Sequence, residues 1–362
     1  MSKPKNSKEF REELAKQFVG VLEEEGLEWK QGWVSTRPVN AISGKQYKGI
    51  NTLRLGLTAK ELGYDDPRWA TMVQIMDKEK KYHPSQEWKL QKGSKATYVE
   101  YWYPIKLQDV ANTKHSKAIT WAQFKKEIKE GASVLNYTFR ANFTPVFNAS
   151  QINGIPPFEV QKSDVELSNI VNMLSQNMNV PIIYEGDRAY YSPKLDEIHL
   201  PPVKMFHSDY EVNATAFHEL AHSTGHPKRL NRNIQNNPFG SEAYAYEELV
   251  AEISSCFLGF NTPQTQEHID NHKAYIQSWI QAISKKPETL INAIKDADKA
   301  ADYMEAYAHI ISLEEYEQRQ NNTLTIPEKN ILPKKYYLMK YTPYYINSRN
   351  KTAGCLYVII NL

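Results

Sequence analysis

The chain has little cysteine and no long apolar run. Its 362 residues include two cysteines, Cys256 and Cys355, which cannot form a disulfide framework or a four-cysteine zinc site. No apolar run approaches the roughly 18 residues that a membrane span needs. Residues 1–8 are polar and basic, and no apolar signal core follows them. We therefore expect a soluble, cytoplasmic protein without a membrane partner.

The composition indicates a globular chain with two unlike parts. Apolar residues make up 41% and charged residues 24%, which excludes wholesale disorder and a fibrous fold. Residues 1–160 carry 25 Lys and Arg against 18 Asp and Glu, whereas residues 161–329 carry 14 against 24. Six of the seven tryptophans lie in the first 125 residues. At roughly 150 residues per domain, this asymmetry predicts a basic, tryptophan-rich domain followed by an acidic one.

The boundary between the two is predicted near residues 154–165, where Gly154-Ile155-Pro156-Pro157 interrupts any regular element. The first domain then spans 1–155 and is called the front part; the second spans 160–315 and is called the back part. Residues 316–362 form a tail with a basic, tyrosine-rich stretch at 334–345. Such a tail could add phosphate contacts or have no function.

The periodicity of the front part predicts a mixture of helices and strands. Helices are expected over 6–25 and 52–62, and a third is expected to open at Asp66-Pro67-Arg68-Trp69 and reach residue 80. Residues 97–102 and 137–147 read as strands. This mixture indicates an α+β fold rather than an alternating βαβ pattern.

Basic and aromatic residues lie near one another in the front part. Proteins that bind single-stranded nucleic acid combine a positive groove with flat side chains on which bases stack. The tryptophans and basic residues that fit this description are Trp29, Trp33, Trp69, Trp102, Lys45, Lys48, Arg54 and Arg68. On composition alone, the simpler interpretation is that the tryptophans fill the core and the lysines cover the surface.

The strongest motif is His218-Glu219-Leu220-Ala221-His222, within an apolar stretch that predicts a helix over 212–224. Side chains four apart on a helix point the same way, so His218 and His222 can hold one zinc ion. Glu219 can reach a water on that ion and act as the general base. Gly225 is expected to end the helix.

A catalytic zinc needs a third protein ligand, and residues 244–258 predict a helix that can supply it. Glu248 and Glu252 share a face of this helix, and burying two carboxylates there is costly without a cation. We assign Glu248 as the ligand and Glu252 as the residue that orients a histidine, because this order matches metalloproteases whose ligand helix reads E-x-x-x-D. Glu247 remains an alternative ligand.

The residues around the motif define a gluzincin-like site. In metzincins a third histidine ligand follows the motif at a spacing that corresponds to position 228 of this chain. The residue there is Lys228, which excludes a metzincin site. His226 is interpreted as a structural or substrate-side residue. Residues 189–201 predict a hairpin that could accept an extended peptide by strand addition. The candidates for a second oxyanion donor are Tyr191, Tyr244, Tyr246 and His226.

Several stretches of the sequence resemble one known family. In the front part they are residues 46–51 (QYKGIN), 66–69 (DPRW) and 146–151 (VFNASQ). In the back part they are 189–191, 196–201, 217–232 (FHELAHSTGHPKRLNR), 246–258, 275–279 and 300–303. Over roughly residues 8–305 the chain resembles the ArdC-type antirestriction proteins of conjugative plasmids and phages. These join an N-terminal single-stranded-DNA-binding domain to a zincin-like metallopeptidase domain.

The resemblance implies a DNA-binding front part, with Tyr47 and Asn51 added to the basic and aromatic residues above. It also implies a zinc peptidase site on His218, His222 and a glutamate of the 247–252 helix, with Glu219 as the catalytic residue. The expected partners are single-stranded DNA and a protein substrate such as a restriction endonuclease or a regulator. Two alternatives remain: a DNA-protecting protein with a structural zinc, or a peptidase that cleaves a DNA-associated regulator.

The chain departs from the family in two places. The segment from Tyr103 to Gly131 is long and contains a basic, helix-like insert at 121–129 (WAQFKKEIK). The tail after about residue 317 has no counterpart that we can place.

Overall fold

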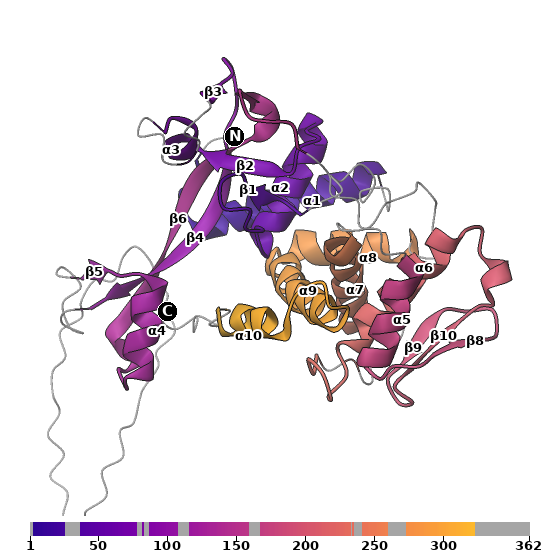
Figure 1. The fold of residues 1–362 in the computed structure, drawn as a ribbon. Coiled ribbons are helices and arrows are strands. Elements are labelled where there is room, and N and C mark those ends of the chain that lie inside the picture. Colours follow the sequence, from indigo (N-terminus) through magenta and orange to yellow (C-terminus); the bar gives the residue numbers. More distant parts are fainter. Residues whose placement is uncertain are drawn as a thin grey trace, which may run out of the picture.

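The computed structural model describes residues 3–25, 37–77, 82, 87–107, 116–158, 167–232, 234, 241–259 and 273–322. Within these ranges the chain mixes helices with a five-stranded sheet in the front part and a three-stranded sheet in the back part (Figure 1). The predicted α+β class is confirmed. No helix among the described residues is long and apolar enough to cross a membrane.

The front part is built on a sheet with the strand order β1-β2-β6-β4-β5. Its strands are β1 (Val39–Asn40), β2 (Arg68–Thr71), β4 (Thr97–Lys106), β5 (Lys117–Ala118) and β6 (Tyr137–Asn148). Its helices are α1 (Ser7–Glu25), α2 (Ile50–Leu62), α3 (Met72–Ile75) and α4 (Trp121–Lys129). A small second sheet pairs β3 (Lys89–Leu90) with β7 (Ile152–Asn153). Two 3-10 turns, Val134–Asn136 and Ala149–Gln151, flank β6.

The predicted helices over 6–25 and 52–62 and the two predicted strands are confirmed, but the third predicted helix is wrong. Residues 68–71 form β2, which pairs with both β1 and β6. Trp69 and Ala70 are fully buried in two different apolar clusters, so this strand is covered on both faces. Thr71 then caps the short helix α3 through reciprocal hydrogen bonds with Gln74.

Strands β4 and β6 form a long antiparallel ribbon. They pair from Thr97 opposite Val146 to Lys106 opposite Tyr137. Figure 1 shows the ribbon leaving the rest of the front part and ending at β5 and α4. The far end has an apolar cluster of its own, centred on Phe124 of α4 and Phe139 of β6. The helix-like insert predicted at 121–129 is therefore confirmed as α4.

The back part surrounds a sheet with the strand order β8-β10-β9. Its strands are β8 (Ile182–Tyr184), β9 (Tyr190–Ser192) and β10 (Glu197–Leu200), and a 3-10 turn follows at Val203–Met205. Its helices are α5 (Leu167–Asn177), α6 (Asp209–Ser223), α7 (Glu242–Gly259), α8 (Lys273–Lys285), α9 (Glu288–Tyr307) and α10 (Leu313–Asn322). Strands β9 and β10 are antiparallel neighbours, so the predicted hairpin is confirmed. Residues 334–345 and 356–362 of the predicted tail lie outside the described residues.

The front and back parts share one apolar core. Helices α1 and α2 of the front part pack against α7, α8 and α9 of the back part. The buried side chains at this contact include Leu14, Phe18, Leu22, Leu53, Leu57, Leu249, Ile253, Phe257, Trp279, Ile283 and Ile294. A buried cation reinforces the contact, because Nε of Arg37 donates to the carbonyl oxygen of Phe257 at 3.1 Å.

Candidate metal centre

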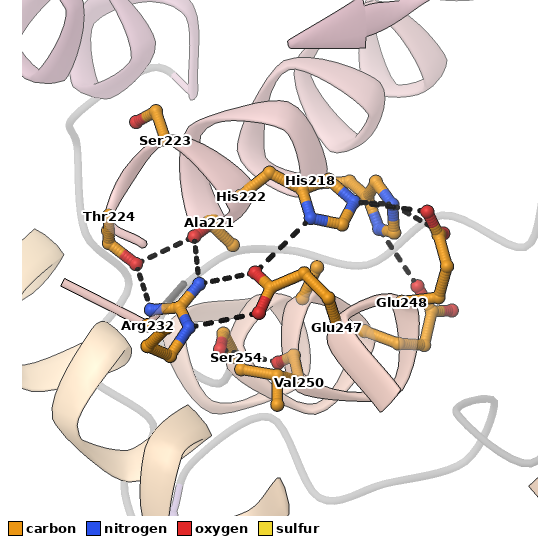
Figure 2. A network of polar contacts seen from close by, with 12 residues as sticks. His218, Ala221, His222, Ser223, Thr224, Arg232, Glu247, Glu248, Val250 and Ser254 are labelled. Atoms are coloured by element: carbon orange, nitrogen blue, oxygen red, sulfur yellow. Dashed lines mark hydrogen bonds and ion pairs between the residues drawn. The ribbon is translucent and has the colours of Figure 1, made fainter. Parts of the chain in front are cut away.

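Helix α6 presents the histidine motif from a well-defined start. Its N-cap is Ser208, whose hydroxyl accepts a hydrogen bond from the backbone amide of Glu211 at 3.2 Å. Its apolar face, which includes Ala216 and Leu220, is buried against α5 and the three-stranded sheet. The helix predicted over 212–224 is confirmed. His218 and His222 lie one turn apart, so both imidazoles face α7 (Figure 2).

His218, His222 and Glu248 converge on one point between α6 and α7. The two Nε2 atoms lie 3.1 Å apart. The carboxylate of Glu248 lies 3.4 Å from Nε2 of His218 and 3.5 Å from Nε2 of His222. One donor atom from each side chain falls within 4.8 Å of the other two. Among the described residues, no other three metal-binding side chains meet in this way.

Each imidazole has a further carboxylate behind it. Nδ1 of His218 lies 3.1 Å from Glu252, and Nδ1 of His222 lies 3.4 Å from Glu247. Glu247 is itself held by Arg232, whose Nη2 and Nε donate to its two oxygens at 2.5 and 3.1 Å (Figure 2). The alternative ligand Glu247 therefore lies on the Nδ1 side of His222, away from the Nε2 atoms.

Sequence reasoning missed the arrangement of Arg232 and Glu247. From the sequence, Arg232 is only the last residue of the stretch 217–232 that resembles the family. Its Nη1 donates to Thr224 Oγ1 at 2.6 Å and its Nη2 donates to the carbonyl oxygen of Ala221 at 3.0 Å. These bonds return the chain to the end of α6, beside Glu247. No local spacing could reveal this placement, because it depends on how the loop after α6 folds back.

The buried carboxylates control the protonation of both imidazoles. Burial alone would lower the pKa of His218, but the carboxylates of Glu248 and Glu252 outweigh it and raise that pKa to about 9. Burial is likewise outweighed at His222, whose pKa rises well above its usual value because Glu248 and Glu247 are close. Burial would raise the pKa of Glu248, yet the two histidines hold it far below its usual range. The centre is thus a strongly negative pocket that favours a cation.

Glu219 lies one position beyond His218 on α6 and is buried. A helix advances about 100° per residue, so its carboxylate lies beside the two histidines rather than between them. Its negative charge contributes to the raised pKa of His222. This is the place that the motif predicts for a residue that acts on a bound water.

Two of the candidate oxyanion donors are engaged by the turn of the hairpin. The hydroxyl of Tyr191 donates to Asp196 at 2.7 Å and accepts from Arg229 at 3.1 Å. His226 accepts from the backbone amide of Lys228 at 3.2 Å and hydrogen-bonds to the carbonyl of Pro193. Asp196 also forms an ion pair with Arg229. These contacts tie the β9–β10 turn to the loop after α6 and give His226 a structural position.

The third candidate in this set, Tyr246, is directed elsewhere. Its hydroxyl donates to Asp296 of α9 at 2.8 Å. Two positions on a helix differ by about 200°, so Tyr246 and Glu248 occupy different faces of α7. The expectation that Tyr246 supplies an oxyanion donor is therefore wrong. For Tyr244, which precedes it on α7, the described contacts give no argument for or against such a role.

Several predicted DNA contacts are buried in the fold. Trp69 is fully buried in the sheet core. Arg54 is 3% exposed, donates to Gln17 of α1 at 2.8 Å and lies over the ring of Phe10. Asn51 exchanges two hydrogen bonds with the backbone of Glu100 on β4, at 2.8 and 2.9 Å. These three residues hold the front part together. The burial of Trp69 and Arg54 contradicts their prediction as DNA contacts, whereas for the half-buried Asn51 it stays a prediction.

Two basic residues of the same prediction are occupied by carboxylates. Lys48 forms an ion pair with Asp302 of α9 in the back part. Arg68 binds Asp66 with two nitrogens and donates to the carbonyl oxygen of Pro156 at 2.6 Å. Their charges are paired within the fold, and their role as DNA contacts stays a prediction.

The remaining predicted contacts have a mixed outcome. Lys45 is exposed, and Tyr47 and Trp102 are half-buried. Tyr47 packs beside the cluster around Trp69, and Trp102 packs beside the cluster of α4. Trp29 and Trp33 lie outside the described residues. Of the ten predicted residues, Lys45 is the one that is both described and exposed.

Comparisons with known proteins agree with this architecture. Residues 8–143 match the N-terminal domain of anti-restriction factor ArdC, and residues 169–296 match the zincin-like metallopeptidase family. The chain is 34% identical to the DNA primase TraC of Escherichia coli over 83% of its own length and 27% of the primase. It thus spans about a quarter of that relative.

Two solved structures match this chain over almost the whole length of the related protein. The metal-free crystal structure of the antirestriction ArdC protein from plasmid R388 superposes with a TM-score of 0.63 at 28% identity, over 83% of this chain and 98% of that one. The Mn(II)-bound structure of the same protein gives 0.61 at 26% identity, over 83% and 99%. The predicted family resemblance is confirmed by both domain matches and by these structures.

Proposed function

Because this chain joins an ArdC N-terminal domain to a zincin-like metallopeptidase domain, as the ArdC-type antirestriction proteins do, we propose that it protects DNA from restriction. In this proposal the front part binds single-stranded DNA and the back part is a metal-dependent peptidase. Zinc is the metal we propose, and the substrate is a protein that acts on the same DNA. The existence of a Mn(II)-bound crystal structure of the R388 protein supports a divalent metal in this family of proteins.

The observation that carries the proposal is the spacing of the three donors. Ligands held tetrahedrally at about 2.0–2.1 Å from zinc lie roughly 3.3–3.4 Å from one another. The two Nε2 atoms lie 3.1 Å apart, one oxygen of Glu248 lies 3.4 Å from Nε2 of His218, and its other oxygen lies 3.5 Å from Nε2 of His222. Two buried imidazoles and a carboxylate are also the ligand types of a catalytic zinc with one open position. These residues therefore fit the metal.

The residues around the metal would have separate tasks. A bound zinc would supply a Lewis acid that polarises the scissile carbonyl and acidifies a water. Glu219 would take a proton from an attacking water and would later deliver it to the leaving amine. Glu252 and Glu247 lie against Nδ1 of the two histidines, which would leave Nε2 of each to hold the metal. A purely structural metal site would not need Glu219.

Two substitutions test the peptidase. Glu219→Gln should retain zinc and abolish hydrolysis, whereas His222→Ala should lose zinc. The matched control is Glu242→Gln, which changes an exposed glutamate at the start of α7 and should leave both unchanged. Full hydrolysis by Glu219→Gln would refute the mechanism, and zinc retained by His222→Ala would refute the ligand set.

A second experiment relates the peptidase to protection. Wild type, Glu219→Gln and Glu242→Gln are incubated with single-stranded DNA and a restriction endonuclease, and DNA cleavage is scored. Loss of protection in Glu219→Gln alone, with the endonuclease fragmented by wild type, is the expected result. Equal protection by all three would mean that DNA is shielded sterically. Cleavage of a different DNA-associated protein would favour a regulator as the substrate.

A further inference from the structure

One face of the β4–β6 ribbon is covered along its length by helices. Near the body of the front part, Phe10 of α1 packs on Phe143 with ring centroids 5.5 Å apart. Arg11 of α1 lies 3.6 Å from the buried Glu100 on the same face. At the far end, Trp121 of α4 stacks on Phe139 at 5.6 Å. This face is therefore part of the apolar core at both ends.

The opposite face is covered at its base and again at its far end, where the cross-strand pair Ile105 and Thr138 is buried. At the base, α2 buries Val99 and Val146 beneath Leu55 and Ala59. Farther along, no described helix lies over the middle of this face, and four polar or aromatic side chains occupy it in two cross-strand pairs. These pairs are Tyr101 opposite Asn142 and Tyr103 opposite Arg140.

The four side chains are accessible to a ligand. Tyr101 is 53% exposed, Arg140 and Asn142 are exposed, and Tyr103 is half-buried. None of them forms a side-chain hydrogen bond or an ion pair with another residue that the structure describes. Two tyrosine rings and a guanidinium are thus wholly or partly exposed on one face of the paired strands, without a side-chain partner among the described residues.

The surroundings of this face are basic. Residues 97–148 contain seven Lys and Arg against four Asp and Glu. Of these acids, Glu100 is buried beside Arg11, and Glu127 forms an ion pair with Lys106, whose Nζ lies 2.8 Å from its Oε2. Lys117, Lys126 and Lys129 are exposed at the far end of the ribbon. A polyanion that lies on the middle of the ribbon would meet Arg140 there and would meet these lysines only where it passes the far end.

We infer that the face formed by Tyr101, Tyr103, Arg140 and Asn142 is the surface on which single-stranded DNA lies. The inference rests on the proposed function, since it places the DNA of that proposal. Bases stack on the two tyrosine rings, and a phosphate contacts Arg140 on the same face. Stacking uses the flat face of a base, which a duplex hides within its helix, so the surface selects single strands. It also explains how the front part binds DNA although five of the residues first predicted for it are occupied within the fold.

The test is DNA binding by the full chain, measured by fluorescence anisotropy with a labelled thymine oligonucleotide longer than the roughly 16 nucleotides that such sites cover. Tyr101→Ala and Tyr103→Ala should each weaken binding at least about fivefold, because a stacked base is lost. Tyr101→Phe keeps the ring and should bind like wild type. Arg140→Gln should reduce the slope of log affinity against log salt by about 0.7.

Matched controls lie on the back part. Tyr184→Ala removes a tyrosine that is 44% exposed on β8, and Arg188→Gln removes an exposed arginine; both should leave DNA binding unchanged. Zinc content and the thermal unfolding midpoint of every variant should equal those of wild type, because the altered side chains have no described internal partner.

The outcomes separate the two proposals. If wild type does not bind single-stranded DNA, the proposed function fails and the inference fails with it. If wild type binds and the ribbon variants bind equally well, the DNA lies elsewhere and only the inference is overturned. Equal weakening by the ribbon variants and the back-part controls would also overturn it.

Discussion

Nδ1 of His222 lies 3.4 Å from Oε1 of Glu247, and the same oxygen lies 2.5 Å from Nη2 of Arg232. The second histidine of the metal centre therefore has a carboxylate partner, as the first has in Glu252. Glu247 is in turn anchored by a guanidinium that is bonded to the end of α6. The orientation of His222 thus depends on a residue of the loop that follows its own helix.

Replacing Glu247 should weaken the metal site without destroying it. Removal of a carboxylate that orients a ligand histidine lowers metal affinity about 10- to 100-fold. Glu247→Ala and Glu252→Ala are therefore expected to lose zinc affinity within this range, whereas Glu248→Ala should lose zinc binding more severely. Competition with a chromophoric chelator measures all three, with Glu242→Ala as the control. If Glu247→Ala proved more damaging than Glu248→Ala, Glu247 would be the ligand.

The Asp196–Arg229 pair should make stability depend on pH at the acidic end. Burial would raise the pKa of Asp196, but Arg229 and Tyr191 overcome this and lower it. A carboxylate with a lowered pKa stabilises the fold above the pKa of its unfolded state and loses that contribution as the pH falls through its folded value. Asp196→Asn should therefore cost about 1.5–3 kcal/mol at neutral pH.

The measurement is urea unfolding of wild type and Asp196→Asn between pH 7 and pH 3. The difference in unfolding free energy should be constant down to about pH 4, near the unfolded pKa, and shrink below it. An effect that stays the same at low pH would show that the charge of Asp196 contributes nothing.

Phe18 of α1 should stabilise both parts of the chain at once. It is fully buried in the core that α1 and α2 share with α7, α8 and α9. Phe18→Ala should lower the unfolding free energy by about 3–5 kcal/mol. Unfolding can be measured by zinc release and, separately, by loss of DNA binding. The midpoints of the two curves should shift by the same amount. Two separate transitions, with only DNA binding affected, would contradict a common core.

Arg54 gives a contrasting prediction for the front part. Its guanidinium is buried against Gln17, Glu13 and the ring of Phe10. Arg54→Met should leave these groups without their partner and destabilise the fold by about 3 kcal/mol or more. At temperatures where the variant remains folded, DNA affinity and its salt dependence should equal those of wild type. A smaller slope of log affinity against log salt in the variant than in wild type would show that Arg54 contacts DNA.

The elements that sequence predicts correctly are those with a strong local signal. The histidine motif fixes its own geometry because residues four apart on α6 share a face, and the hairpin of β9 and β10 is marked by its turn. The ligand helix α7 was recognised from Glu248 and Glu252 on one face. In each case the information lies within about 15 residues of the chain.

Predictions from sequence fail where segments distant in the chain determine whether a residue is buried or which strand it pairs with. Trp69 and Arg54 have the composition of a nucleic-acid surface, yet α1 and the neighbouring strands bury them. Residues 68–71 lack the alternation of a half-exposed strand because both faces of β2 are covered, and the proline before them suggested a helix start. Conversely, Tyr101 and Arg140 are 39 positions apart in the sequence, so only the register of the ribbon brings them to one face.

The shared core also bears on how the chain is made. Arg37 and the carbonyl of Phe257 that it binds are 220 residues apart. Leu14, Phe18 and Leu53 likewise pack against helices α7, α8 and α9, which are synthesised much later. As the chain leaves the ribosome, the front part must keep these apolar side chains in water until α7, α8 and α9 have been synthesised. Such a delay exposes a nascent chain to aggregation. Helices α1 and α2 are thus the segments that a chaperone would most need to bind during synthesis.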